Sequence, residues 1–382
     1  MFSADEVLYN LTMRIITTHS TTNKILHPFV KTKLVQLGKM CLFLLAAFFI
    51  FAIFLHVSRF NGYRRVYFAD MIYGRAWRPF VYRMLLPQTA RLIVAPIPIS
   101  TRALIDTHLY SIPSFHHIFD TIGWEEQYLV EYMTAAGLMF LSLVGFGWAL
   151  LYLFTGIYKA PPWLTSFIPF LGILALPPLF SYTYIYDFPT LFFFTLGLAY
   201  LIRRKWNLYL FIFTAGCLNK ETIILLLIIF FFYYLKDQFL SRRKFIQLIL
   251  AQLMIFTVIR LLLLWIFRNN PGTFLEFHLV DHNLPLLIQL IKPYSFLVLI
   301  FILIFGYIFV YYWSAQPRIL KISFYCVIPT LLILTLLFGF LEEWRDYYEA
   351  YPIIIIILTF SICQLIGVNI KVKPLGLLEN IN

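Results

Sequence analysis

Long apolar runs recur along this chain from residue 41 to residue 368. Hydrophobic residues make up 61% of its 382 residues, whereas charged residues make up only 13%. A soluble domain cannot bury so large an apolar fraction, but helices that cross a bilayer expose it to lipid. The sequence therefore predicts an all-α polytopic integral membrane protein with about eight full spans. The predicted spans lie near residues 41–57, 133–155, 164–180, 188–202, 245–267, 294–313, 322–340 and 352–368.

Both ends of the chain are expected on the cytoplasmic side. Residues 1–40 lack the short apolar core and cleavage pattern of a signal peptide, so we interpret them as a cytoplasmic tail. Residues 41–368 then form a single transmembrane domain, and residues 369–382 form a second cytoplasmic tail. The net charge of +12 would suggest nucleic acid as a partner of a soluble protein. Here the basic residues set the membrane topology instead, and no nucleic acid partner is expected.

The segment 206–235 carries polar residues in the middle of an otherwise apolar run. Basic clusters flank it at residues 203–205 and 242–244, and the positive-inside tendency puts both clusters in the cytoplasm. A chain that enters and returns has only about 14 residues per arm, or about 21 Å of helix, which is less than a full crossing. We predict a short helical hairpin with residues 219–222 at its apex. The alternative is a single long tilted helix, which would break the charge rule.

With that hairpin, the long loop 58–132 comes out on the outer face. Apolar residues recur at helical spacing from Pro79 to Ile93, which predicts helices that lie in the membrane interface. Arginines at that level can hold a phosphate through forked hydrogen bonds, or they can bind anionic lipid without specificity. The candidate phosphate ligands in this loop are Arg64, Arg65, Arg75, Arg78 and Arg83.

Asp70 is the one carboxylate among those arginines. Beside a phosphate site, it would suit a general base that deprotonates an acceptor hydroxyl. The alternative is that Asp70 only forms an ion pair with Arg64, Arg65 or Arg75. Asp187 is a further candidate, but it precedes Pro189 at the start of an apolar run, where an aspartate commonly caps a helix.

Asn219, Lys220 and Glu221 at the predicted apex are also candidates for substrate binding. Ionisable residues at membrane depth are costly and usually face a cavity or a partner. Asn219 is expected to cap the second arm, and a structural ion pair that pins the hairpin is the alternative to a functional role. The last outer loop adds Glu342 and Arg345. Because all these segments fall on one side, we predict that they share an outward-facing polar cavity, Asp70 included.

Metal binding finds little support in the sequence. His278 and His282 lie four residues apart with Asp281 between them, but no third ligand has a matching spacing. The four cysteines lie far apart, in or beside apolar runs, and indicate packing. We therefore expect neither a metal nor another cofactor.

Four short blocks carry a resemblance to a known family. They are YRMLLPQ (82–88), YDFPTLFFFTLGL (186–198), LNKETIILL (218–226) and EEWRDYYEAYP (342–352). In this order they resemble blocks of bacterial membrane proteins related to the GT-C superfamily of membrane glycosyltransferases. The long outer loop after the first span is similar to the one in that superfamily.

The resemblance implies transfer of a sugar from a polyprenyl-phosphate donor to a glycan, lipid or protein acceptor on the outer face of a bacterial plasma membrane. It also implies that Asp70 is the catalytic base. The alternative is a non-enzymatic flippase or transporter of a lipid phosphate or a lipid-linked sugar, and a scaffold for envelope assembly is a third. The scarcity of acidic residues on the cytoplasmic side favours the enzyme, since a transporter must also open inward.

Overall fold

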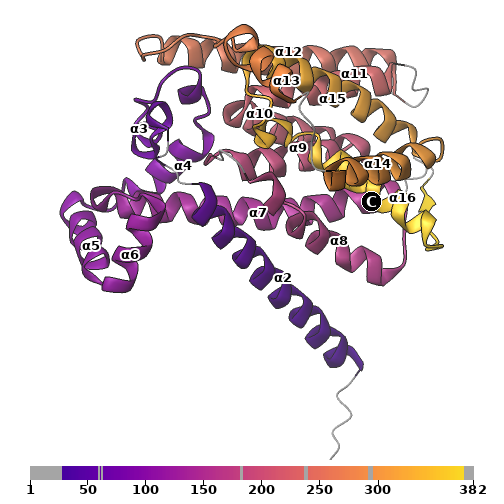
Figure 1. The fold of residues 1–382 in the computed structure, drawn as a ribbon, viewed down its shortest axis with the longest axis horizontal. Helices are drawn as coiled ribbons and strands as arrows, with labels where there is room; N and C mark the ends of the chain where they lie inside the picture. Colours follow the sequence, from indigo (N-terminus) through magenta and orange to yellow (C-terminus); the bar gives the residue numbers. More distant parts are fainter. Residues whose placement is uncertain are drawn as a thin grey trace, which may run out of the picture. The chain divides into compact units, whose positions relative to one another are not determined.

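A computed structural model describes residues 28–58, 61, 63–180, 184–235, 240–290 and 296–373. The chain divides into two compact units, one ending at Leu45 and the other beginning at Ala46. In the first unit the described residues form the beginning of helix α2 (Pro28–Ser58) (Figure 1). The rest of the expected N-terminal tail lies outside the described residues, as does most of the expected C-terminal tail 369–382.

The second unit is helical almost throughout, as predicted. Its only described strands are β1 (Tyr158–Lys159) and β2 (Lys371–Val372), which pair antiparallel. The α-helices that follow α2 are α3 (Phe68–Ile72), α4 (Leu85–Val94), α5 (Ile99–Ser111), α6 (Pro113–Ile122), α7 (Leu129–Ile157), α8 (Pro162–Leu174), α9 (Asp187–Ile202), α10 (Trp206–Asn219), α11 (Leu225–Tyr234), α12 (Arg242–Ile266), α13 (Leu284–Leu290), α14 (Phe296–Tyr311), α15 (Arg318–Phe338) and α16 (Tyr351–Leu365). Short helical turns among them are η1 (Arg64–Val66), η2 (Phe80–Tyr82), η3 (Glu126–Tyr128), η4 (Pro177–Leu179), η5 (Glu221–Ile224), η6 (Leu279–Asn283) and η7 (Trp344–Tyr347).

Five helical segments among the described residues are long and apolar enough to cross a membrane. They are Lys33–Val57, Glu126–Ile157, Pro162–Leu179, Arg242–Ile266 and Arg318–Phe338, and each overlaps a predicted span. The three other predicted spans fall on α9, α14 and α16, which have 15 or 16 residues. These apolar helices are consistent with a membrane protein, and the number of full crossings stays a prediction.

Helix α12 illustrates the apolar surface. Met254, Leu261 and Trp265 lie along it with 60% to 65% of their surface exposed. Large exposed apolar side chains in such a row are costly in water and favourable against lipid. The buried side chains of the unit lie instead between α7 and α9, which pack along each other, and around α4, α8 and α10.

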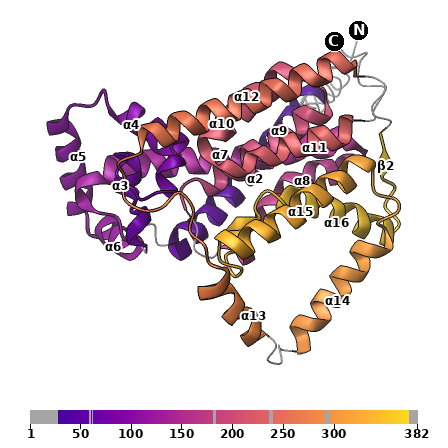
Figure 2. The same ribbon diagram turned by 90° about the horizontal axis from the view of Figure 1, so that it is seen from above.

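The predicted hairpin is confirmed. Helix α10 ends at Asn219, Lys220 has an extended backbone, and η5 and α11 carry the chain back. The two ends of the hairpin meet, because the rings of Trp206 and Tyr234 lie 5.4 Å apart between centroids. Gly216 allows the tight return, since a Cβ atom there would lie 2.6 Å from Ile223. Helices α10, α11 and α12 lie together (Figure 2).

Aromatic packing fixes the start of α9. The ring of Phe188 lies 4.3 Å from that of Phe54 at the end of α2, and Phe180 packs edge-on against both. Phe188 is fully buried in this group. An aromatic pair of this kind contributes about 0.5–1.5 kcal/mol in addition to the free energy of burying its surface. The residues just before and after Phe188 are therefore held in place at the start of α9.

The first loop contains helices, as predicted, but the helix expected from Pro79 to Ile93 is interrupted. Turn η2 ends at Tyr82, Arg83 and Met84 connect it to α4, and α4 begins at Leu85. Helix α4 packs on α7, so its buried face belongs to the core of the unit. The interruption leaves the Arg83 side chain at a bend, where it can turn inward.

Residues 270–272, which follow α12, hold residues 74–78 of the first loop in place. The backbone N–H of Arg78 donates to Pro271 O over 2.8 Å, and its guanidinium donates to Gly272 O over 2.7 Å. The Nδ2 of Asn270 donates to Gly74 O and Ala76 O. Together these bonds attach residues 270–272 to the segment that leads to Arg83.

Gly272→Ala is expected to destabilise the protein. Gly272 has φ +93°, and an added Cβ atom would lie 2.5 Å from Arg78 O. Backbone strain and overpacking each cost about 1–3 kcal/mol, so we expect a lower unfolding temperature in detergent. Gly123→Ala is the matched control, because Gly123 also has a positive φ but no atom within 4 Å of the added Cβ. Equal effects of the two variants would contradict the assigned contact.

Candidate functional site

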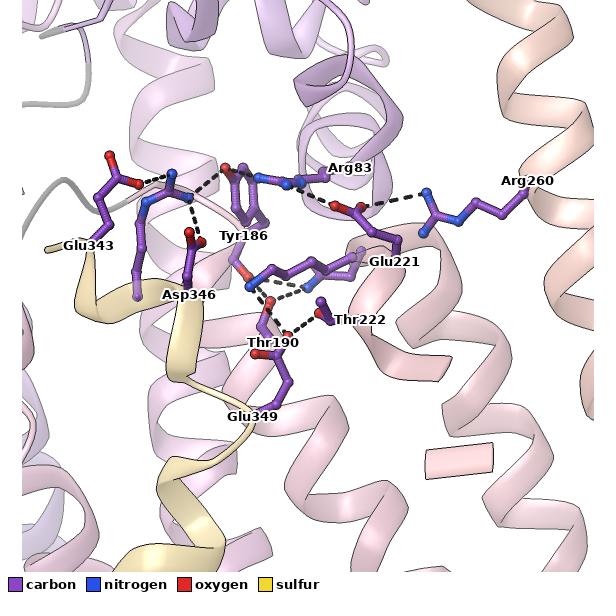
Figure 3. Close-up of polar contacts among 12 residues, drawn as sticks. Arg83, Tyr186, Thr190, Glu221, Thr222, Arg260, Glu343, Asp346 and Glu349 are labelled. Atoms are coloured by element: carbon purple, nitrogen blue, oxygen red, sulfur yellow. Dashed lines mark hydrogen bonds and ion pairs between the residues drawn. The ribbon is translucent and has the colours of Figure 1, made fainter. Parts of the chain in front are cut away.

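Five separate parts of the chain meet in one group of polar side chains (Figure 3). They are the bend after η2, the start of α9, the hairpin apex, α12 and the last loop. We call this group the apex cluster, and it consists of Arg83, Tyr186, Asp187, Thr190, Asn219, Lys220, Glu221, Thr222, Arg260, Glu343, Arg345, Asp346 and Glu349. Tyr186, which directly precedes Asp187, lies together with residues 219–222 and the last loop, and Arg83 joins them.

Tyr186 and Asp187 form the turn that opens α9. Asp187 lies in the first turn of the helix, and its Oδ2 accepts the backbone N–H of Tyr184 over 2.6 Å. The expected helix cap at Asp187 is therefore wrong, because the carboxylate holds the preceding turn. Asn219 does not cap the second arm either, since its Nδ2 donates to Tyr186 O and Thr190 Oγ1 over 3.2 and 2.9 Å. The amide ties the hairpin apex to α9.

Two buried arginines converge on the hydroxyl of Tyr186. Arg83 and Arg345 both donate to it, and each guanidinium also lies over a tyrosine ring. Arg345 has carboxylate partners in its own loop, Glu343 and, at 3.9 Å, Asp346. Burial raises the pKa of the Glu343 carboxyl, and the neighbouring Arg345 guanidinium opposes that shift. The last loop thus brings in a buried positive group that its own carboxylates partly neutralise.

Glu221 lies at the edge of the cluster between two arginines. Its Oε1 is 2.9 Å from Arg83 Nη2, and its Oε2 is 3.7 Å from Arg260 Nη1. The Glu221 side chain is 41% exposed, whereas that of Arg83 is 9% exposed. Solvent or a ligand can therefore reach the cluster at Glu221.

Lys220 lies on the inner side of the apex. Its Nζ is 3.3 Å from Glu349 Oε1, and both side chains are almost completely buried. Thr222 Oγ1 donates to the same carboxylate. Lys220 and Glu221 are adjacent but have separate partners: Lys220 points to the last loop, while Glu221 points to the first loop and α12.

Several polar atoms of the cluster have no hydrogen-bond partner among the described residues. They include the Nε atoms of Arg83, Arg260 and Arg345 and the Oε2 of Glu349. The cavity beside Lys220 and Glu349 has a volume of about 10 Å³, the size of one water molecule. The predicted polar cavity is thus a packed network with one small void and an exposed edge at Glu221.

The predicted base, Asp70, makes a different contact. Its carboxylate lies 3.3 Å from Arg75 Nε, and both side chains are well exposed. This is the ion pair that the alternative reading of Asp70 anticipates. No contact described for Asp70 involves a member of the apex cluster, so a catalytic role for it stays a prediction.

The other predicted arginines of the first loop also lie apart from the cluster. Arg65 forms an ion pair with Glu276, and Arg78 bonds to the backbone of Gly272. Arg64 is exposed on η1. Of the five first-loop arginines predicted to bind phosphate, Arg83 alone has a described contact with the cluster.

Glu342 points away from Arg345. Its Oε1 lies 2.6 Å from His282 Nε2, while the neighbouring Glu343 faces Arg345. His278 has Asp281 and Glu276 within 3.5 Å. The two histidines thus have different carboxylate partners, and in the described parts of the chain no group of three His, Cys, Asp or Glu side chains could hold a metal ion.

Sequence reasoning missed Arg260, Tyr186 and Glu349. Arg260 is the only charged residue between positions 245 and 266, which is a signal by itself, because a lone charge in an apolar span needs a partner. Glu349 lies in the quoted EEWR loop, but four acidic residues compete there. Nothing in the pattern distinguishes Tyr186 from the aromatic residues that typically lie at a membrane surface.

The arrangement can bind an anion. Arginine donates forked hydrogen bonds to phosphate, and the cluster brings three arginines and a lysine together with five carboxylates, of which Glu221 is the most exposed. Comparison with family models, curated proteins and solved structures finds no match for this chain. The resemblance to membrane glycosyltransferases therefore stays a prediction, and the geometry of the cluster carries the functional argument.

Proposed function

We propose that this protein is a membrane glycosyltransferase that takes a sugar from a polyprenyl-phosphate donor, and that the apex cluster binds the donor phosphate. The observation that carries the proposal is the pairing of Arg83 and Arg260 with the exposed Glu221. Arg260 belongs to α12, whose apolar side chains face outward. A lipid-linked donor that approaches along α12 would meet this edge first.

The chemistry of such a transfer suits the arginines. The acceptor oxygen forms a bond to the anomeric carbon, the bond from that carbon to the phosphate oxygen breaks, and the polyprenyl phosphate leaves with the bonding electrons. Charge grows on the phosphate as it leaves, and guanidinium groups in a site with little water stabilise that charge. The guanidinium nitrogens of Arg83 and Arg260 that face Glu221 are donors that a phosphate could take over at this edge.

A base must also take the proton of the acceptor hydroxyl. Glu221 is a candidate within the cluster, in addition to the predicted Asp70. A carboxylate between two guanidinium groups is a weak base, and it becomes a stronger one when a phosphate takes those groups as partners. Donor binding would then prepare Glu221 for proton transfer.

Arg260→Gln and Glu221→Gln are expected to lower the rate of transfer by about 100-fold or more, as is typical when a charge-stabilising group is removed. Cells that lack the protein should accumulate the lipid-linked sugar, as measured by lipid mass spectrometry. The wild type should relieve the accumulation, and the two variants should not. Arg268→Gln is the matched control, because Arg268 is exposed and its described contact is with the ring of Trp265 outside the cluster.

Asp70→Asn separates the two candidate bases. If Asp70→Asn abolishes relief while Glu221→Gln retains it, Asp70 is the base and the role of Glu221 is wrong. Full relief by both Arg260→Gln and Glu221→Gln would overturn the phosphate site. In each case immunoblots of the membrane fraction must show that the variants reach the level of the wild type.

The loss of a flippase would also cause lipid-linked sugar to accumulate, so a second measurement is needed. Purified protein in detergent, where no membrane sides exist, should release polyprenyl phosphate from the lipid fraction of the deletion cells when an envelope extract supplies the acceptor. A flippase would leave that lipid unchanged. Absence of release with folded wild-type protein would therefore favour the non-enzymatic alternative.

A further inference from the structure

The first loop encloses a second cavity that shares no residue with the apex cluster. Its volume is about 680 Å³, and it lies where α5, η3 and the start of α7 meet. Tyr73 and Tyr128 contribute aromatic walls, and their rings lie 5.7 Å apart between centroids. Cavities of about 300–1,000 Å³ are typical of sites for small molecules.

The charge of the cavity is opposite to that of the chain. Four carboxylates line it, from Asp106, Glu125, Glu126 and Glu131, against one guanidinium from Arg102. The whole chain has a net charge of +12. An excess of negative charge inside a concave surface attracts cations and disfavours phosphate or other anions.

Glu131 is one of two buried carboxylates that line this cavity. Its side chain is 4% exposed, and its Oε1 accepts from Arg102 Nη1 over 2.9 Å and from Tyr73 over 3.2 Å. Its Oε2 has no hydrogen-bond partner among the described residues. A buried carboxylate oxygen without a donor is unfavourable, so a ligand that brings a donor is favoured there.

Asp106 extends the same wall and is itself 4% exposed. Its Oδ1 accepts the backbone N–H of Val130 over 3.0 Å, which links α5 to the start of α7. The two buried carboxylates thus belong to a braced surface that faces the cavity. Glu125 and Glu126 contribute further negative charge on η3 and beside it.

We propose that this cavity binds the ammonium group of a small organic cation, with Glu131 Oε2 as an acceptor. An ammonium group has three N–H donors and a full positive charge, so it matches an unpartnered carboxylate oxygen and an acidic wall. The ring of Tyr128 adds a surface on which a cation can lie. The inference is independent of the proposed glycosyl transfer. The cation can be a soluble amine, such as an amino sugar, or the ethanolamine headgroup of a lipid.

Calorimetric titration of the purified full-length protein in detergent tests the proposal. The probes are glucosamine and glucose, because glucosamine carries an ammonium group where glucose carries a hydroxyl group. We expect saturable binding of glucosamine and at least about 10-fold weaker binding of glucose. Equal affinity for the two sugars would overturn the proposal.

Glu131→Gln should weaken glucosamine binding at least about 10-fold, because it removes the charge that pairs with the ammonium group. Asp120→Asn is the matched control, since Asp120 is an exposed carboxylate on α6 that does not line the cavity. Glu131 also pairs with Arg102, so Glu131→Gln can affect folding. Ala103→Phe offers a second route, because Ala103 lines the cavity and a large ring there should exclude the ligand. Unchanged binding in the folded variants would overturn the proposal.

Nanodiscs of two compositions distinguish a soluble amine from a lipid. Phosphatidylethanolamine should compete with glucosamine and raise its apparent Kd if the headgroup occupies the cavity, whereas phosphatidylglycerol should not. Competition that Ala103→Phe abolishes would support the ammonium site with a lipid as its source. If glucosamine does not bind in detergent and phosphatidylethanolamine does not raise the unfolding temperature relative to phosphatidylglycerol, the cavity is not an ammonium site.

Discussion

Lys220→Met is expected to destabilise the protein by about 3–5 kcal/mol, because it removes the charged partner of a buried carboxylate. Glu349 has no exposed surface, and its Oε1 lies 3.3 Å from Lys220 Nζ. Methionine has a similar shape and length but no charge, so the substitution keeps most of the packing. Thermal unfolding of the purified protein in detergent, followed by tryptophan fluorescence, measures the effect.

The double variant Lys220→Met, Glu349→Gln tests the cause of that loss. When both charges are removed, the cost of an unpaired buried charge disappears, and replacing a whole buried pair is often close to neutral. We therefore expect the double variant to be more stable than Lys220→Met alone. If the double variant loses as much stability as Lys220→Met and Glu349→Gln lose in sum, Lys220 and Glu349 do not stabilise each other in the way that the structure indicates.

Arg345→Met is expected to have an effect of similar size, again about 3–5 kcal/mol. The substitution leaves the buried Glu343 without its guanidinium partner and removes one of the two donors to the Tyr186 hydroxyl. Under the proposed function it also removes a positive charge near the donor phosphate. The unfolding temperature and the level of lipid-linked sugar in complemented cells are the two measurements.

Two further variants serve as comparisons for Arg345→Met. Arg75→Met should cost less than about 1 kcal/mol, because Arg75 and Asp70 form an exposed pair. Arg345→Lys keeps the charge but loses the planar fork that reaches both Tyr186 and Glu343, so it should lie between Arg345→Met and the wild type. An Arg345→Met protein as stable as the wild type would contradict the role of Arg345 in the cluster.

The hairpin could be predicted because several independent signals agreed. Basic residues at both ends predicted the same side of the membrane for both flanks, and the length between them was too short for two crossings. The contact between Trp206 and Tyr234 confirms the return of the chain. The polar residues 219–222 then had to lie at the turn, and their contacts with other segments followed from the cost of isolated charges in an apolar segment.

The partners of individual side chains could not be predicted in the same way. Glu342 and Glu343 are adjacent, yet Glu343 faces Arg345 and Glu342 faces His282, because the backbone between them turns just before η7. Asp70 was chosen as the single acid among arginines, but nearness in sequence leads equally to its exposed pair with Arg75. A charge pattern indicates that pairs will form and does not indicate which ones.

Three of the eight predicted spans fall on helices that are shorter than a full crossing, and α9 and α16 show why. Helices α9 and α16 are apolar but have 16 and 15 residues, which is fewer than the roughly 20 that cross a bilayer without tilt. Both begin within the apex cluster or directly after it. The residues that would have lengthened them form the polar turn of α9 and the last loop.

The apex cluster joins residues that are made at very different times. Thr222 and Glu349, which share a hydrogen bond, are 127 residues apart, and Arg83 and Glu221 are 138 residues apart. A ribosome that adds about 5–20 residues per second needs several seconds or more to cover such distances. During that interval Lys220 has been synthesised but its carboxylate partner has not. A nascent chain that stops before the last loop therefore contains an unpaired lysine in an apolar hairpin, which is a costly place for an isolated charge.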